Sequence, residues 1–183
     1  ELTGAFRALG DTPDVRAIVL AGNGPAFCAG ADLNWMKKMA GYSNDENRAD
    51  ALTLAQMLHT IWSCPKPVIA RVHGDTYAGG VGLVAACDVA VAAEGVNFCL
   101  SEARLGLLPA TISPYVIRAM GEQAARRYFI TAERFDAAEA LRIGFVHATV
   151  PAAGLDAKVA ELAATLVGNS PNAVRESKRL VQE

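Results

Sequence analysis

Four short segments of the chain are almost continuously apolar. Continuous apolarity, in contrast to alternation, is typical of strands that are covered on both faces, as in a parallel sheet. The pattern therefore predicts strands over residues 15–21, 67–72, 87–92 and 144–150.

Apolar residues at helical spacing fill the stretches between these predicted strands. Ser43 and Glu46 match a capping box, which opens a helix that should end before Pro65. The spacing of its apolar residues is helical and predicts one buried side. That side consists of Ala51, Leu54, Leu58, Ile61 and Trp62.

The last helix is predicted from a start signal, since Ser170 precedes Pro171 and the pattern continues through Leu180. Strands and helices therefore alternate along the chain, which predicts an α/β fold with one main sheet. We find no repeat, low-complexity tract or linker, and 183 residues with 52% apolar content suffice for one core. We expect a single domain over residues 1–183.

Charge and cysteine content narrow the function classes. The formal net charge of −2 and the absence of a basic run longer than Lys37-Lys38 or Arg126-Arg127 argue against nucleic-acid binding. The four cysteines have no C-x-x-C spacing, so we interpret them as reduced structural residues of an intracellular protein. No apolar run approaches the ~20 residues of a membrane span, and the first residues do not form a signal peptide. Glu1 resembles mid-protein sequence, so we expect a fragment.

Several known catalytic and cofactor-binding motifs are incomplete or absent in this sequence. Gly22 and Gly24 begin a dinucleotide fingerprint, but Phe27 stands where its third glycine is needed. No phosphate-binding loop or G-x-S-x-G motif is present, and the three histidines have no metal-ligand spacing. We interpret His73 as a partly buried residue that bonds to the backbone.

Two turns of small residues carry the candidate chemistry. They are Cys28-Ala29-Gly30-Ala31-Asp32 and Ala78-Gly79-Gly80-Val81-Gly82, and each links a predicted strand to a predicted helix. Free N–H groups at a helix start favour negative charge, and glycine lets a ligand approach the backbone. If both turns face one carbonyl oxygen, the N–H groups of Ala31 and Gly79 form an oxyanion hole. The alternative is that these glycines only allow helix and sheet to pack closely.

The order and spacing of these motifs and their flanks resemble the enoyl-CoA hydratase/isomerase (crotonase) family. The resemblance rests on residues 27–33, 73–88, 98–102 and 105–109, and it continues through residues 121–125 and 140–146. It implies a spiral of ββα units with two roughly perpendicular sheets surrounded by helices. It also implies acyl-CoA substrates, no metal, no cofactor besides the coenzyme A of the substrate, and a homotrimer or a dimer of trimers.

The resemblance assigns roles residue by residue. The oxyanion-hole donors fall on Ala31 and Gly79, and the catalytic glutamate falls on Glu102. The family's other catalytic glutamate falls on Gly82, so this second acid is absent. Further substrate and coenzyme A contacts fall on Cys28, Ala29, Gly30, Asp32, Leu33, Gly80 and Pro109.

Two departures from the family bear on the substrate. Pro109 is followed by residues 110–114, Ala-Thr-Ile-Ser-Pro, where the family has a glycine-rich turn, so we expect a reshaped acyl pocket. The family's N-terminal strand hairpin and C-terminal helical segment are expected to be missing. In finer detail residues 33–36, 100–107 and 112–114 resemble bacterial hydratases of leucine and acyclic-terpene breakdown, which act on methylglutaconyl-CoA or carboxygeranoyl-CoA.

Three functions stay open on the sequence. In the first, Glu102, its pKa raised by burial, activates water for addition to a 2-enoyl-CoA. A carboxylate of the substrate would help to position the water, with Arg104 and Arg118 as candidates to pair it. In the second, Glu102 as sole base isomerises a Δ3 to a Δ2 double bond. In the third, the chain is a non-catalytic relative that binds coenzyme A or RNA. We favour the hydratase, acting in the bacterial cytoplasm without nucleic-acid or membrane partners.

Overall fold

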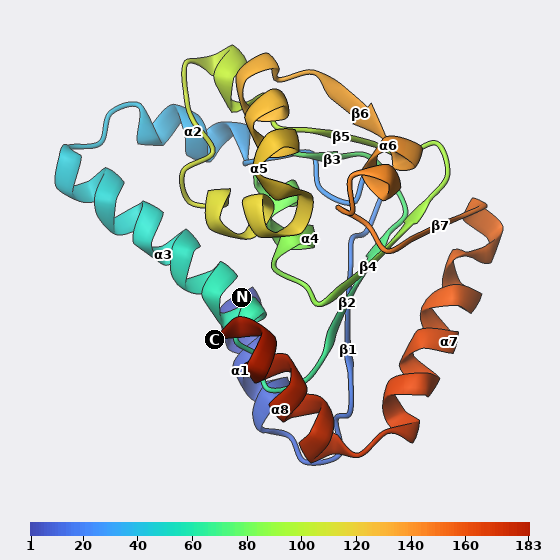
Figure 1. Ribbon diagram of the computed structural model, residues 1–183. Coiled ribbons are helices and arrows are strands. Elements are labelled where there is room, and N and C mark those ends of the chain that lie inside the picture. The colour runs from blue at the N-terminus through green and yellow to red at the C-terminus, as the bar shows by residue number, and fades with distance from the viewer.

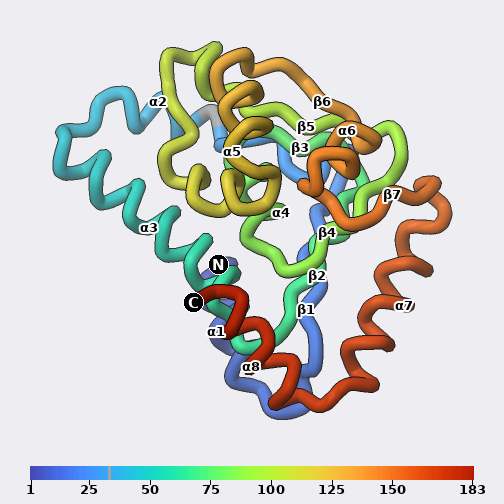
Figure 2. The backbone as a smooth tube through the Cα atoms, in the orientation of Figure 1, coloured from blue at the N-terminus to red at the C-terminus, as the bar shows by residue number. Residues whose placement is uncertain are grey.

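A computed structural model describes residues 1–183 apart from the side chain of Leu33 (Figures 1 and 2). Its strands are β1 (Ile18–Ala21), β2 (Val68–Val72), β3 (Thr76–Tyr77), β4 (Val89–Ala93), β5 (Asn97–Cys99), β6 (Arg134–Asp136) and β7 (Ala148–Val150). Its α-helices are α1 (Leu2–Asp11), α2 (Leu33–Met39), α3 (Asn44–Trp62), α4 (Gly79–Ala85), α5 (Ser113–Thr131), α6 (Ala137–Arg142), α7 (Leu155–Gly168) and α8 (Pro171–Gln182). Two 3₁₀ helices are η1 (Ser101–Leu105) and η2 (Ala152–Gly154).

The four predicted strands form one parallel sheet in the order β1-β2-β4-β7. The predicted strand over 144–150 is shorter than expected, because Gly144 adopts a φ of 77° and turns the chain before β7. α7 packs on β2 and β4, and in Figure 1 it lies on the opposite side of these strands from α3. Burial on both faces explains why β2 contains so many fully buried residues.

A second sheet, in the order β3-β5-β6, was not predicted from the apolar pattern. Its strands have only two or three residues, too few to show a period. β3 and β5 are parallel, whereas β5 and β6 are antiparallel. Each of β2 and β4 is thus followed by a short strand of the second sheet and then by a helix, which is the ββα unit that the resemblance implied.

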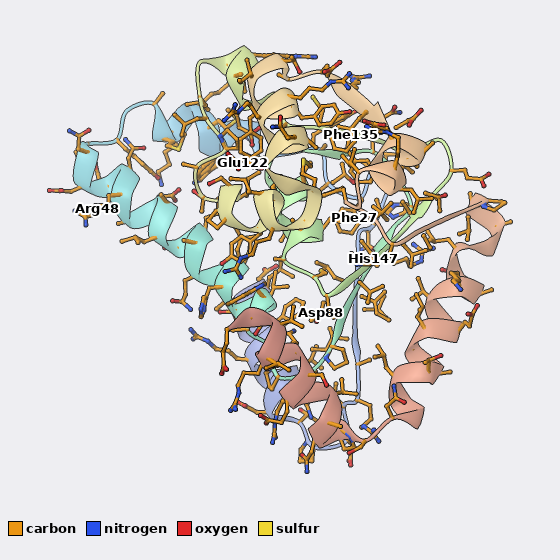
Figure 3. The ribbon with its side chains drawn as sticks, in the orientation of Figure 1. Phe27, Arg48, Asp88, Glu122, Phe135 and His147 are labelled. Atoms are coloured by element: carbon orange, nitrogen blue, oxygen red, sulfur yellow. The ribbon has the colours of Figure 1, made fainter. Side chains whose placement is uncertain are left out.

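An aromatic cluster packs on one face of the second sheet and includes side chains from β5 and β6. Phe98 contacts Phe135 and Phe145, with ring centroids 5.4 and 5.3 Å apart, and Tyr128 lies 4.3 Å from Phe135. All four rings are buried, and Figure 3 shows Phe135 on β6 at this end of the molecule. The cluster anchors β5, which leads directly into η1.

The predicted helix signals are confirmed. Ser43 and Glu46 form the reciprocal capping box of α3, and that helix ends at Trp62, before Pro65. α8 begins at Pro171, although the Ser170 side chain makes no capping bond. The four cysteines are free thiols. None of the helices in the described part of the chain is both long and apolar enough to cross a membrane.

α8 is tied to the sheet by a largely buried ion pair. Lys178 Nζ lies 2.7 Å from Asp88 Oδ2 and also donates to the Lys66 carbonyl. Asp88, which Figure 3 places between α8 and the sheet, also accepts a bond from the Val68 N–H. Burial raises the pKa of Asp88, although the Lys178 ammonium and the Val68 N–H oppose this rise.

We expect Lys178→Met to lower the free energy of unfolding by roughly 3 kcal/mol at neutral pH, because it leaves the Asp88 carboxylate buried without its cation. The folded-state pKa of Asp88 lies above its ordinary value, so protonation favours the folded state. The penalty is therefore present at neutral pH and is relieved as the pH falls through the raised pKa. Urea unfolding at neutral and mildly acidic pH measures both effects. In Lys178→Met/Asp88→Asn the loss should be smaller, and equal losses in the single and double variants would contradict this account.

Candidate active site

Three segments from distant parts of the sequence run parallel at the centre of the site. Cys28 bridges Thr76, and Thr76 in turn pairs with Phe98. The Tyr77 N–H donates to the Cys28 carbonyl and the Ala78 N–H donates to the Cys99 carbonyl, both at 2.8 Å. Because the segments are parallel, the residues after each of them emerge at the same edge. The first leads to Ala31, the second to Gly79 and the third to Glu102.

Asp75 holds these three segments in register. Its backbone carbonyl accepts bonds from the Phe27 and Cys28 N–H groups, at 3.1 and 3.3 Å. Its carboxylate accepts the Asn97 N–H at 2.8 Å and the Tyr77 hydroxyl at 2.5 Å. Burial opposes ionisation, but the bonds from Tyr77 and Asn97 prevail and lower the pKa of Asp75. The sequence did not reveal this residue, since a single aspartate between two glycine-containing turns carries no motif.

The first turn leaves the Ala31 N–H free but caps part of the helix that follows. Asp32 is the N-cap of α2, and its carboxylate accepts the N–H groups of Asn34 and Trp35 at 2.7 and 3.0 Å. These two helical N–H groups are therefore closed to a ligand, because the N-cap side chain occupies them. Within the described residues the Ala31 N–H has no acceptor, and Ala31 is exposed, as are Ala29 and Asp32.

The second turn contains a strained residue at its start. Ala78 adopts φ 48° and ψ −119°, a conformation that costs a non-glycine residue about 1–3 kcal/mol. It is held there by its bond to Cys99 and by the Val81 N–H, which donates to the Ala78 carbonyl at 2.9 Å. The next N–H, that of Gly79, has no acceptor in the described part of the chain.

The two turns touch each other, and their glycines have different roles. A Cβ on Gly80 would lie 2.6 Å from the Cys28 Cβ, so Gly80 is a close-packing glycine. A Cβ on Gly79 would meet nothing within 4 Å, which leaves the space around its N–H open. Gly30, with φ 106°, approaches Ala78 across the gap, since its Cβ would lie 3.8 Å from that of Ala78. Close packing therefore explains Gly80, whereas it does not explain Gly79.

Glu102 stands in η1 with a buried, unpaired oxygen. Its Oε2 finds no hydrogen-bond partner among the described residues. Burial raises the pKa of the carboxyl group, and a bond to its own backbone opposes this only in part. The predicted direction is confirmed. Of its expected apolar neighbours in the sequence, Leu100 is buried, but Leu105 is 61% exposed and shields little.

Gly82 faces a side chain that no sequence motif connects with it. A Cβ at this position would lie 2.6 Å from the Ile112 Cβ and closer still to its Cγ2. Ile112 is 3% exposed and forms the N-cap of α5. Buried Pro109 accepts the Ser113 N–H at 2.9 Å and fixes the turn that carries Ile112. The glycine at 82, where the family has its second acid, and the altered turn over residues 110–114 are thus complementary in space.

The arginine and histidine residues singled out in the sequence contact other parts of the protein. Arg104 donates to the Ala132 carbonyl at 2.6 Å, and the Arg118 guanidinium lies 5.1 Å from the centre of the Trp62 ring. His73 lies 2.9 Å from the Gly24 carbonyl through Nε2, which confirms the backbone-bonded histidine. The expected contact residue Leu33 lies outside the described side chains. The described residues contain no cluster of His, Cys, Asp or Glu that could hold a metal ion.

The chain is similar to known proteins in both sequence and structure. A family model described as enoyl-CoA hydratase/isomerase matches residues 1–183. An enoyl-CoA hydratase from Shewanella pealeana is similar in structure, with a TM-score of 0.96 and 42% identity over 99% of this chain and 68% of its own. Pseudomonas aeruginosa AtuE has a TM-score of 0.95 and 37% identity over 99% and 70% of the two chains. The enoyl-CoA hydratase AKT6-1 of Alternaria alternata is 37% identical over 81% of this chain.

These likenesses confirm the expected crotonase-like α/β fold. The chain spans about half the length of the Alternaria relative, at 48%, and about two thirds of the length of the two structures.

We expect Gly82→Ala to destabilise the protein by about 2 kcal/mol, because the added methyl group overlaps Ile112 in a filled core. Gly79→Ala is the matched control: it adds the same group to the same helix, where nothing lies within 4 Å, and should leave stability nearly unchanged. Urea unfolding measures both. In an Ile112→Gly background the cost of Gly82→Ala should largely disappear. An undiminished cost there would contradict the proposed clash.

Proposed function

Because this chain belongs to the enoyl-CoA hydratase/isomerase family, we propose that it adds water to a 2-enoyl-CoA thioester through an enolate held by backbone donors. The observation that carries the proposal is the convergence of the Ala31 turn, the Gly79 turn and Glu102 at one edge of three parallel segments. Coenzyme A enters as part of the substrate, and no further cofactor is proposed.

The Ala31 and Gly79 N–H groups are proposed to bind the thioester oxygen. Charge develops on this oxygen when water attacks Cβ, and fixed neutral donors stabilise it without requiring a buried cation. Both donors lack acceptors within the described residues, and both belong to turns that hydrogen bonds and packing hold in place. Such a pre-set pair does not have to reorganise during the reaction.

Glu102 is proposed to be the acid–base group. Its carboxylate takes a proton from water as the water oxygen bonds to Cβ, and the double-bond electrons move toward the thioester carbonyl. The enolate then collapses and Cα gains a proton. A raised pKa suits this role, because a carboxyl group whose pKa lies nearer to neutral can both accept and return a proton.

Isomerisation of a 3-enoyl-CoA is the second candidate, and Gly82 favours it. A shift of the double bond needs one base to move a proton between Cα and Cγ, and Glu102 is such a base. The relatives named enoyl-CoA hydratase favour hydration. On the finer resemblance, we propose a branched acyl group such as that of methylglutaconyl-CoA, and a homotrimer or a dimer of trimers as the assembly.

Paired substrates separate the two reactions. The protein, incubated with 2-enoyl-CoA and 3-enoyl-CoA esters including methylglutaconyl-CoA, should yield 3-hydroxyacyl-CoA from the 2-enoyl esters. Loss of the 2-enoyl absorbance and mass spectrometry of the product measure this. Conversion of the 3-enoyl esters alone, without hydration of any 2-enoyl ester, would establish the isomerase and overturn the hydratase.

Glu102→Gln should reduce kcat by about 10²- to 10⁴-fold, because the amide cannot accept and return the proton. Binding of a CoA ester should persist, since the backbone donors are unchanged, and calorimetric titration with a substrate analogue measures it. Glu122→Gln, on the exposed face of α5, is the control and should leave kcat unaltered. Near wild-type turnover by Glu102→Gln would remove Glu102 from its role.

A further inference from the structure

Position 82 lies on the same helix face as the Gly79 donor. The two residues are three apart in α4, and residues at this spacing are neighbours about 5–6 Å apart on a helix surface. A side chain at 82 would therefore stand close to the thioester oxygen that Gly79 is proposed to bind. The space around Gly79 is open, whereas Gly82 is buried.

Ile112 occupies the space above Gly82 and has little freedom to leave it. The clash with an added Cβ involves the Ile112 Cβ at 2.6 Å, so a change of side-chain rotamer cannot relieve it. The Ile112 Cα lies at 3.7 Å, an ordinary contact. Its carbonyl accepts the Tyr115 and Val116 N–H groups, each at 3.1 Å, which fixes the residue to the first turn of α5. Alanine at 112 would keep the obstructing carbon, and only glycine would remove it.

We infer that Ile112 makes this a one-carboxylate active site, by filling with hydrocarbon the space where a second acid would stand. The inference rests on the proposed hydration. Glu102 then performs both proton transfers: it takes a proton from the attacking water and delivers one to Cα after the new C–O bond has formed. No other acid or base takes part at position 82, and the wall beside the reacting carbons is apolar.

Opening this space and placing a charge in it tests the inference. Gly82→Glu/Ile112→Gly should hydrate 2-butenoyl-CoA at least about 10-fold faster than Gly82→Gln/Ile112→Gly, because only the carboxylate can hold and deprotonate water. The two variants are matched in size, so a merely structural effect changes both equally. Where the glutamate pair does not fold, the shorter Asp and Asn variants at 82 replace it.

Single variants complete the design. Gly82→Glu with Ile112 in place should lose most activity, as should Gly82→Gln, since neither side chain fits. Val116→Ala removes a fully buried neighbour on α5 and controls for cavity formation. Equal hydration rates in the folded Glu and Gln double variants would overturn the inference while leaving the hydratase proposal intact. A wild-type protein that hydrates no 2-enoyl-CoA would overturn the proposed function itself.

Discussion

The parallel pairing of three short segments, at Cys28, Thr76 and Phe98, is the constraint on which the site depends. Parallel register places the ends of all three segments at one edge, so the turns with Ala31 and Gly79 and the 3₁₀ helix with Glu102 all start there, although about 70 residues separate the first segment from the last. Asp75 secures this register by bonding to the first segment through its carbonyl and to the third through its carboxylate. A slip of one residue would turn each side chain to the other face. The same register lets Phe98 of β5 pack in the aromatic cluster and lets the strained Ala78 donate its N–H to the Cys99 carbonyl.

Asp88 and Glu102 are two partly buried carboxyl groups, and the fold compensates the cost of burying their charge differently. Burial raises the pKa of both Asp88 and Glu102. Asp88 is compensated by Lys178 and by a backbone N–H, and the pair joins α8 to the sheet. Glu102 has no such partner for its Oε2 within the described residues. A partly buried carboxyl group without a partner destabilises the folded state. Carboxyl groups with such a raised pKa cluster at functional sites.

Packing and chemistry are coupled at Gly82. Gly82 lies in α4, and Ile112 is the N-cap of α5. The Ile112 side chain fills the space beside residue 82, and it fits there because Gly82 has no side chain. Gly80 repeats the principle nearby in α4, where Cys28 fills the space beside it. Neighbouring glycines thus differ in their surroundings: Gly80 lets the two turns approach, Gly79 has open space beside it, and Gly82 accommodates the Ile112 side chain.

The sequence by itself determined the four strands of the main sheet, the capping of α3, the start of α8 and the family, because these depend on local patterns and on motifs in order. It also located the two turns and Glu102. It did not determine the second sheet, whose strands are too short to show a period, or the self-capping of α2 by Asp32. The roles of Asp75, Ala78 and Ile112 were decided by tertiary structure alone. Register, backbone strain and steric overlap are relations between residues far apart in the chain, and no local pattern records them. The glycine at 82 was visible in the sequence, but only its contact with Ile112 showed that the position is filled.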